Sequence, residues 1–252
     1  MNAQKCIQGL LLIAMALSSA CTSMDHARKH QPDPQDRLAA MLELDQNAYA
    51  HGRMCREIWY DNNRVMDCEA IQREIDRLYV EYPQAERVLL ANAVMHFEHG
   101  RPEAAQWLLD ELLARPGSFP QAGILRSQLA LREGNLSLAR RVLEEQIVLA
   151  PGQPLLHEAV ASVHYLTGDY TKADQALRRA DLLGAPQWRT NYHRGLLLEG
   201  QKETVQACDV YRRSLNQNPG YRQPMARLVG LSHQPDCARA LRAVRQSDRP
   251  MS

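Results

Sequence analysis

Two histidines, His96 and His99, come closest in their spacing to a site that could do chemistry. They belong to the run His96-Phe97-Glu98-His99, and a separation of three residues places both near one face of a helix, where they could hold a metal ion. Metalloprotease helices instead carry His-Glu-x-x-His, with the histidines four residues apart. No Gly-x-Ser-x-Gly, phosphate loop or dinucleotide fingerprint occurs in the chain. The sequence therefore favours a non-catalytic protein without a cofactor or a small-molecule substrate. A metal-binding protein using His96 and His99 is the alternative from another class.

The N-terminus has the pattern of an export signal. Lys5 precedes an apolar run over 7–17, and the small residues Ser18, Ser19 and Ala20 follow. About 11 apolar residues are too few for the ~20 that a membrane-spanning helix needs. We therefore expect this segment to direct export and to be removed.

The residues before Cys21 resemble a bacterial lipobox, whose cysteine becomes the first residue of the mature chain and carries the lipid. The match is incomplete, because Leu17 lies four residues before the cysteine and Ser18 takes the place where leucine is usual. The resemblance implies a lipid (palmitate) anchor at Cys21. With Thr22 rather than aspartate next, it also implies an outer-membrane location facing the periplasm. Ordinary secretion with cleavage after Ala20 is the alternative.

Four cysteines remain once Cys6 leaves with the signal and Cys21 carries the lipid: Cys55, Cys68, Cys208 and Cys237. An even number in an exported protein predicts two disulfides, with three possible connectivities. Proximity in the sequence favours Cys55–Cys68 and Cys208–Cys237. Zinc binding is the alternative, although the spacings contain no close Cys-x-x-Cys pair.

A glycine returns every 34 residues, at Gly100, Gly134 and Gly168. An alanine five positions later and a leucine four further keep the same phase, at Ala105, Ala139, Ala173, Leu109, Leu143 and Leu177. Such a period is typical of helix-turn-helix arrays. The stretch Gly168-Asp169-Tyr170-Thr171-Lys172-Ala173 resembles the inter-helix turn and second-helix start of the tetratricopeptide repeat (TPR) family.

The resemblance implies an all-α fold: a TPR-type α-solenoid of about five to six helical hairpins in a right-handed superhelix. Hairpins are expected over 84–114, 120–149, 154–183 and 187–217, followed by a closing pair over 221–231 and 237–245. We expect the fourth hairpin to be off register, because Gly200 falls two residues early and predicts a helix of altered length.

The resulting domain organisation has six parts. These are a signal peptide over 1–20, a lipidated flexible tether over 21–35, an irregular helical hairpin over 36–83, TPR repeats over 84–219, capping helices over 220–246 and a tail over 247–252.

In the TPR family the first helix of each repeat lines a concave groove, and a few of its positions face a partner. Transferred to this sequence, the resemblance implies a partner-binding set in which apolar positions are rimmed by polar ones, as suits an extended or helical peptide segment. The set is Arg87, Leu90, Phe97, Ile124, Gln128, Leu131, Arg132, Ser162, Tyr165 and Arg194. The alternative is that several of these side chains only pack between adjacent helices.

The charge is nearly balanced, with 30 basic and 29 acidic residues, which argues against a nucleic-acid partner. Lipid-anchored proteins of this repeat family in Gram-negative envelopes include secretin pilotins, pilus-assembly proteins, and adaptors for peptidoglycan enzymes or proteases. The resemblance implies a periplasm-facing scaffold that binds a protein partner in its groove, for pilus or secretion-machine assembly. An adaptor or regulator of a peptidoglycan enzyme or envelope protease is the alternative.

Overall fold

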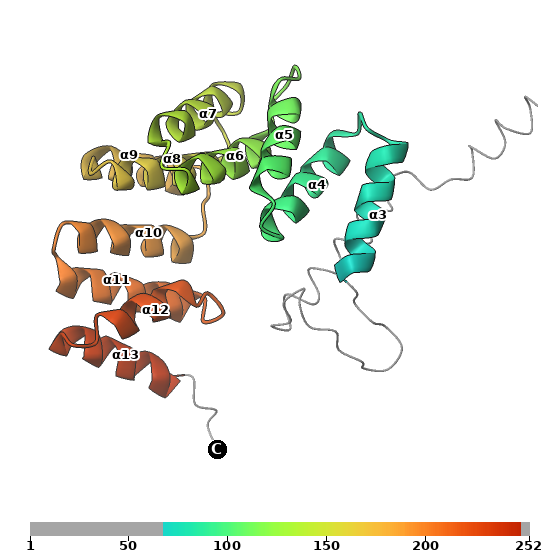
Figure 1. Cartoon of the computed structure of the whole chain (residues 1–252). Coiled ribbons are helices and arrows are strands. Elements are labelled where there is room, and N and C mark those ends of the chain that lie inside the picture. Colours follow the sequence, from blue (N-terminus) through green and yellow to red (C-terminus); the bar gives the residue numbers. More distant parts are fainter. Residues whose placement is uncertain (1–67, 248–252) are drawn as a thin grey trace, which may run out of the picture. The chain divides into compact units, whose positions relative to one another are not determined.

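The computed structural model describes residues 68–247, with side chains from 72 to 244. This part of the chain contains only helices, joined by turns (Figure 1). They are α3 Cys68–Glu81, α4 Glu86–Glu98, α5 Pro102–Leu113, α6 Pro120–Arg132, α7 Leu136–Leu149, α8 Pro154–Leu166, α9 Tyr170–Leu182, α10 Gln187–Gly200, α11 Thr204–Gln217, α12 Gln223–Gly230 and α13 Pro235–Ser247. None of these described helices is long and apolar enough to cross a membrane.

The chain divides into two compact units, Met1–Val88 and Leu89–Ser252. In the first unit the described helix α3 carries its apolar side chains at helical spacing, and Ile75 and Leu78 are fully buried. The predicted disulfide Cys55–Cys68, the predicted lipidation site Cys21 and the predicted signal sequence fall outside the residues whose side chains are described.

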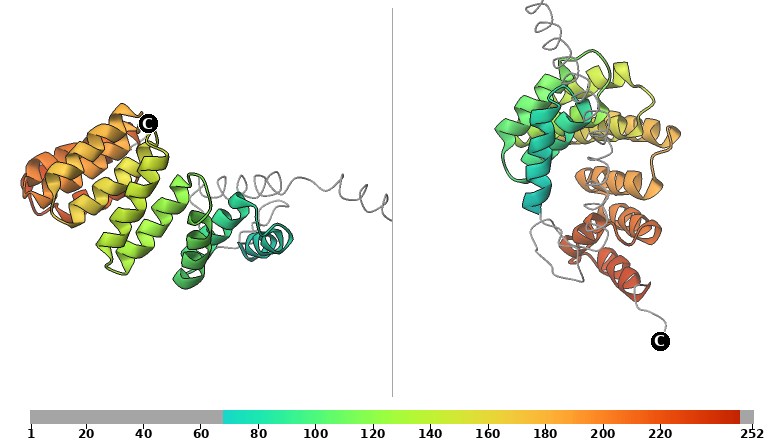
Figure 2. Two further views of the ribbon diagram at one scale, coloured as in Figure 1. Left: turned by 90° about the horizontal axis from the view of Figure 1, so that it is seen from above. Right: turned by 90° about the vertical axis from the view of Figure 1, so that its right-hand side faces the viewer.

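The second unit is a series of hairpins in chain order. Each helix from α5 to α11 contacts the next one along the chain, and α13 closes the series against α11 and α12. First helices of successive hairpins also touch, α6 with α8 and α8 with α10. Figure 2 shows these hairpins side by side from two further directions. The helices lie where the 34-residue period predicts them.

The turns inside the hairpins show why glycine recurs. Gly100, Gly134 and Gly168 have positive φ angles of 69°, 73° and 76°, a region that L side chains enter only at a cost. Two of the following residues cap the next helix: Asn135 accepts from the backbone N–H of Leu138, and Asp169 accepts from that of Lys172. Hydrogen bonds from Lys172 lower the pKa of Asp169 below its ordinary value.

The expected register shift in the fourth hairpin is wrong. Its turn is made by Lys202, 34 residues after Gly168, which adopts a φ of 65° although it is not glycine. Helix α11 then begins at Thr204, in phase with α9. Gly200 instead ends α10, where an added Cβ would lie 2.9 to 3.0 Å from the ring and hydroxyl atoms of Tyr170. It permits close packing on α9 and is not the turn residue.

The small and large positions of the period form the core between paired helices. The predicted set Ala105, Ala139, Ala173, Leu109, Leu143 and Leu177 is fully buried. The fourth hairpin changes the pattern, since Tyr211 occupies the leucine position and Gly195 faces it. A Cβ on Gly195 would lie 2.3 Å from the Tyr211 ring, so the larger side chain requires the smaller one.

The last hairpin is fixed by a disulfide between Cys208 of α11 and Cys237 of α13, as predicted. Both cysteines belong to a buried cluster with Tyr211, Leu215 and Leu241. The bond joins residues 29 apart in sequence, so it ties the closing helix to the fourth hairpin.

Candidate partner-binding surface

Helices α8 and α10, the first helices of the third and fourth hairpins, are joined by several side-chain interactions. We call the side of the second unit formed by the first helices α4, α6, α8 and α10 its first-helix side. Glu158 of α8 is only 4% exposed, and Arg189 of α10 binds both of its oxygens, through Nε at 2.5 Å and Nη2 at 2.8 Å. A buried carboxylate needs such a partner, because an unpaired charge is costly away from water. The pair therefore fixes the relative position of the two helices.

His193, one turn after Arg189, lies beside the same carboxylate, with Nε2 at 3.8 Å from the Glu158 oxygen. Burial lowers the pKa of His193 to about 4, and the charge on Arg189 contributes to the shift in the same direction. Since Arg189 already neutralises Glu158, the imidazole is uncharged near neutral pH.

A pocket of about 310 Å3 opens beside His193, between α8 and α10. We call it the aromatic pocket, and it is lined by Ala161, Ser162, Tyr165, Leu166, Leu177, Tyr192, His193, Leu196 and Leu197. Its lining contains no ionised carboxylate, lysine or arginine. The hydroxyl of Ser162 donates to the backbone carbonyl of Glu158, so the serine directs little polarity into the pocket.

A second, partly exposed network lies at the other end of α10. Glu199 accepts a hydrogen bond of 2.8 Å from the hydroxyl of Tyr211 and is bound by both Nε and Nη2 of Arg227 from α12. Burial, followed by the hydrogen bond to Glu199, raises the pKa of Tyr211. The bond to Glu199 raises the pKa of Arg227. This network holds α12 against the fourth hairpin.

Aromatic rings fill the space between these two networks. Tyr192 contacts Tyr221 edge-on at 5.4 Å and Tyr211 at 6.0 Å, while Trp188 lies 4.7 Å from Tyr221. Burial raises the pKa of Tyr221 to about 12 and also raises that of Tyr192. The hydroxyl groups of Tyr192 and Tyr221 therefore stay protonated near neutral pH and can donate hydrogen bonds.

The structure brings some of the predicted partner-binding residues together. Ser162 and Tyr165 both line the aromatic pocket. Phe97 and Arg132 meet each other, with the guanidinium 3.9 Å above the ring centre, so one face of Phe97 is covered by the chain itself.

The other predicted residues of the second unit do not join the pocket. Ile124 and Leu131 pack against a buried cluster that includes Leu156 and Val160, as the alternative interpretation allows. Leu90 is half-buried and Gln128 is exposed. Arg87 is exposed and belongs to the first unit.

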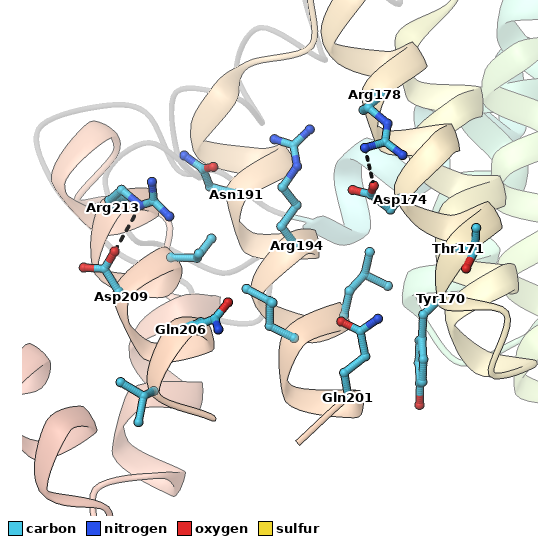
Figure 3. Close-up of a pocket in the computed structure, with 14 residues that line it drawn as sticks. Tyr170, Thr171, Asp174, Arg178, Asn191, Arg194, Gln201, Gln206, Asp209 and Arg213 are labelled. Carbon is cyan, nitrogen blue, oxygen red and sulfur yellow. Dashed lines mark ion pairs between the residues drawn. The ribbon is translucent and has the colours of Figure 1, made fainter. Parts of the chain in front are cut away.

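Arg194 lies in a different hollow from Ser162 and Tyr165. It forms an ion pair with Asp181 of α9 and lines a larger pocket of about 800 Å3 between α9, α10 and α11, which we call the outer pocket. Figure 3 shows Arg194 between two further pairs, Arg178 with Asp174 and Arg213 with Asp209. Each arginine of the outer pocket thus has an aspartate beside it.

Sequence reasoning missed Tyr192 and Leu196 of the aromatic pocket. The signal was present, since these residues stand 34 positions after Glu158 and Ser162. The assumed register shift in the fourth hairpin concealed that relation. In the true register Arg194 corresponds to Val160 and Arg126, both buried, which explains why it turns toward the preceding second helix.

His96 and His99 do not form part of a recognisable metal centre. His96 lies in the last turn of α4 and His99 just beyond it. Among the residues that the structure describes, no three His, Cys, Asp or Glu side chains come together as a metal site.

No model of a known protein family matches the chain, and no curated protein matches it in sequence. Solved structures do match. TTC0263, a TPR protein of Thermus thermophilus, has 20% identity and a TM-score of 0.62, covering 83% of this chain and 99% of its own. A TPR protein of Parabacteroides merdae has 16% identity and a TM-score of 0.56, covering 94% and 78%. PilF of Pseudomonas aeruginosa has 17% identity and a TM-score of 0.51, covering 66% and 75%. These likenesses show the fold, which is the all-α solenoid of TPR proteins.

Proposed function

We propose that this protein is a non-catalytic scaffold that binds a segment of a protein partner on the first-helix side of its second unit. The observation that carries the proposal is the aromatic pocket, which opens between two helices held in place by the ion pair of Arg189 with the buried Glu158. Preformed concave sites with a mainly apolar lining are where proteins bind ligands. The TPR fold supports a protein as that ligand, because stacked helical repeats provide extended binding surfaces.

The composition around the pocket supports a protein partner. Tyrosine, tryptophan and arginine dominate the residues that contribute most to protein–protein binding, since they combine large apolar area with hydrogen-bonding groups. Here Trp188, Arg189 and Tyr192 of α10 gather with Tyr221 of the loop before α12. Their mutual contacts reduce the conformational entropy that binding would otherwise cost.

The proposed location is the outer membrane, facing the periplasm, through a lipid on Cys21. The lipobox-like residues before Cys21 support it. The buried disulfide Cys208–Cys237 supports an oxidising compartment, where such bonds persist. Pilus or secretion machinery is the finer proposal for the partner, and it rests on the resemblance to lipid-anchored repeat proteins of the envelope.

The binding function is tested by affinity capture from detergent-solubilised envelopes, followed by mass spectrometry. We expect the wild-type chain to retain a specific protein that Tyr165→Ala and Tyr192→Ala lose at least tenfold. Trp107→Ala is the matched control, because Trp107 is an aromatic residue of α5 that is 59% exposed and outside the pocket. Equal capture by all variants would remove the pocket from the binding function.

The identity of the captured protein decides the finer proposal. Secretin or pilus-machine subunits support assembly of those machines, whereas cell-wall enzymes or proteases support the adaptor alternative. The location is tested separately, by fractionation and palmitate labelling of the wild type and Cys21→Ser. Release of the variant from the outer membrane supports the anchor, and an unchanged distribution contradicts it.

A further inference from the structure

A small side chain, Ser162, forms part of the wall of the aromatic pocket. Ser162 of α8 stands 34 positions before Leu196 of α10, so the two occupy the same place on successive first helices. At the equivalent place in α6 the chain has Gln128. Ser162 is smaller than Gln128 and Leu196, and the pocket of about 310 Å3 opens beside it.

The size of the pocket limits what can enter it. Small-molecule sites in proteins have volumes of roughly 300–1,000 Å3, so this pocket is at the lower end. It suits one large side chain and is too small for a folded segment. Leu177 and Leu197, both buried, belong to its apolar lining, and Tyr165 and Tyr192 supply aromatic rings.

The charge around the pocket also selects an occupant. The two nearby carboxylates, Glu158 and Glu199, are each bound by an arginine through two nitrogens. The imidazole of His193 is neutral for the reason given above. A cationic side chain entering the pocket would find no open carboxylate, and an anionic one would lose its hydration among apolar groups.

We infer that the aromatic pocket binds one uncharged aromatic or branched aliphatic side chain of the partner segment, as the anchor of the complex. This inference rests on the proposed function and specifies the chemistry of its partner. An anchor of this kind, desolvated between two rings, is the usual centre of a protein–protein interface. The rest of the segment then runs over the first-helix side, with Arg189 and Arg227 near the two ends of α10.

The guanidinium groups add a secondary preference. Arg189 is 25% exposed and Arg227 is 42% exposed, whereas their glutamates are 4% and 18% exposed. Nε and Nη2 of both arginines bind the glutamates, and the exposed part of each guanidinium carries further N–H donors. The segment therefore meets hydrogen-bond donors on both sides of its anchor, which backbone carbonyl oxygens can satisfy.

The test uses single capped amino acids as probes of the pocket. The full chain, held in lipid nanodiscs and labelled at its leucine methyl groups, is titrated with N-acetyl-tryptophanamide, N-acetyl-leucinamide, N-acetyl-glutaminamide and N-acetyl-lysinamide. We expect the first two to shift the methyl resonances of Leu196 and Leu197 and the last two to bind at least tenfold more weakly. Empty nanodiscs control for partition into the lipid.

A pocket-filling variant separates this site from the rest of the surface. Ser162→Leu places at 162 the residue that the next hairpin carries at 196, so the helix accommodates it. We expect it to weaken binding of the tryptophan and leucine probes at least tenfold. Ser137→Leu, an exposed serine of α7, is the matched control and should leave binding unchanged. Thermal unfolding verifies that both variants fold.

The inference is overturned if the lysine probe binds as well as the leucine probe, if no probe shifts the pocket resonances, or if Ser162→Leu binds normally. These outcomes are distinguishable from failure of the proposed function. If the envelope capture yields no specific partner while the probes still bind selectively, the pocket chemistry stands and the scaffold function fails. If a partner is retained by Ser162→Leu, the scaffold function stands and the anchor is wrong.

Discussion

At the scale of single residues, Glu158 and Arg189 show how unequal the two halves of an ion pair can be. The carboxylate is 4% exposed and the guanidinium 25%. Removing the arginine leaves a buried charge without a partner, whereas removing the carboxylate leaves a guanidinium that can turn toward water. The two substitutions therefore should not cost the same.

We expect Arg189→Ala to lower the free energy of unfolding by about 3 kcal/mol and Glu158→Gln by about 1 kcal/mol. Urea denaturation of the purified variants measures both values. Arg178→Ala is the control, because its pair with Asp174 is largely exposed and should contribute less than about 0.5 kcal/mol. A larger loss for Glu158→Gln than for Arg189→Ala would contradict this account of the pair.

His193 predicts a dependence of stability on pH. Its pKa is about 4 in the folded protein and near 6.5 in the unfolded chain. Between these values the unfolded chain binds the proton and the folded protein does not, so stability is full above pH 6.5 and falls as the pH drops toward 4. Between about pH 7.5 and pH 4.5 the loss due to this residue should be about 2–3 kcal/mol.

The measurement compares wild type with His193→Gln at both pH values by urea denaturation. Other acidic groups titrate in both proteins, so the difference between them isolates His193. We expect the variant to lose less stability than the wild type on acidification. Identical losses would show that the pKa of the imidazole is the same in the folded protein as in the unfolded chain.

At the scale of helices, the fourth hairpin depends on the match between Gly195 and Tyr211. Gly195→Ala would bring a Cβ to 2.3 Å from the tyrosine ring, and overpacking of this kind costs about 1–3 kcal/mol. The third hairpin combines Ala161 with Leu177 at the corresponding positions. The double variant Gly195→Ala, Tyr211→Leu should therefore be more stable than Gly195→Ala alone.

Thermal or urea unfolding of both single variants and the double variant measures this coupling. Tyr211→Leu alone loses the hydrogen bond to Glu199 and leaves a cavity beside Gly195, so it is also destabilised. Additive losses would mean that the two residues do not restrict each other.

The turn before α11 offers a stabilising substitution. Lys202 holds a left-handed conformation that the three preceding turns give to glycine. Lys202→Gly relieves strain of about 1–2 kcal/mol, partly offset by the flexibility of glycine in the unfolded chain, so a net gain of about 0.5–1 kcal/mol is expected. Gln201→Gly is the control, since Gln201 has a φ of −80°, and it should lose stability. Calorimetric melting temperatures give the comparison.

The same hairpin explains what the sequence could and could not predict. Helix positions followed from the 34-residue period, because glycine, alanine and leucine each meet a steric demand that recurs in every unit. The register of the fourth hairpin was mispredicted because Lys202, which is not glycine, adopts the strained positive φ of the turn. The nearby Gly200 instead allows close packing against Tyr170. The presence of a glycine in the sequence does not reveal whether it is needed for a positive φ in a turn or for close packing of helices.

The candidate surface was partly predictable for a related reason. Ser162 and Tyr165 were named by the family pattern, and both line the aromatic pocket. The contacts of Arg132 with Phe97 and of Arg194 with Asp181 depend on side-chain directions across helices, which spacing does not fix. Aromatic residues such as Tyr192 become visible as a group only when the register is correct.

At the scale of the whole molecule, the disulfide Cys208–Cys237 stabilises the end of the repeat series. It closes a loop of residues 29 apart in sequence, for which restriction of the unfolded chain predicts about 3–4 kcal/mol. We expect reduction, or the double variant Cys208→Ala, Cys237→Ala, to lower stability by that amount. Hydrogen exchange should accelerate first in α12 and α13, because among the described helices α13 packs mainly on α11 and α12.

Native-state hydrogen exchange followed by mass spectrometry tests this prediction, with oxidised wild type as the reference. Faster exchange confined to the last hairpin supports a local clasp. Uniform acceleration from α5 to α13 would instead show that the described series unfolds as one cooperative block.

The fit of Tyr211 into the space left by Gly195 also bears on how such a chain can evolve. Because α10 and α11 are complementary in shape, they must be inherited as a pair. Replacing either one with the corresponding helix of another hairpin would create a steric clash or a cavity. Duplication and recombination can thus transfer this hairpin as a unit, but they cannot exchange one of its two helices alone. In a protein built from related hairpins, the fourth hairpin has in this way become one whose helices the other hairpins cannot replace.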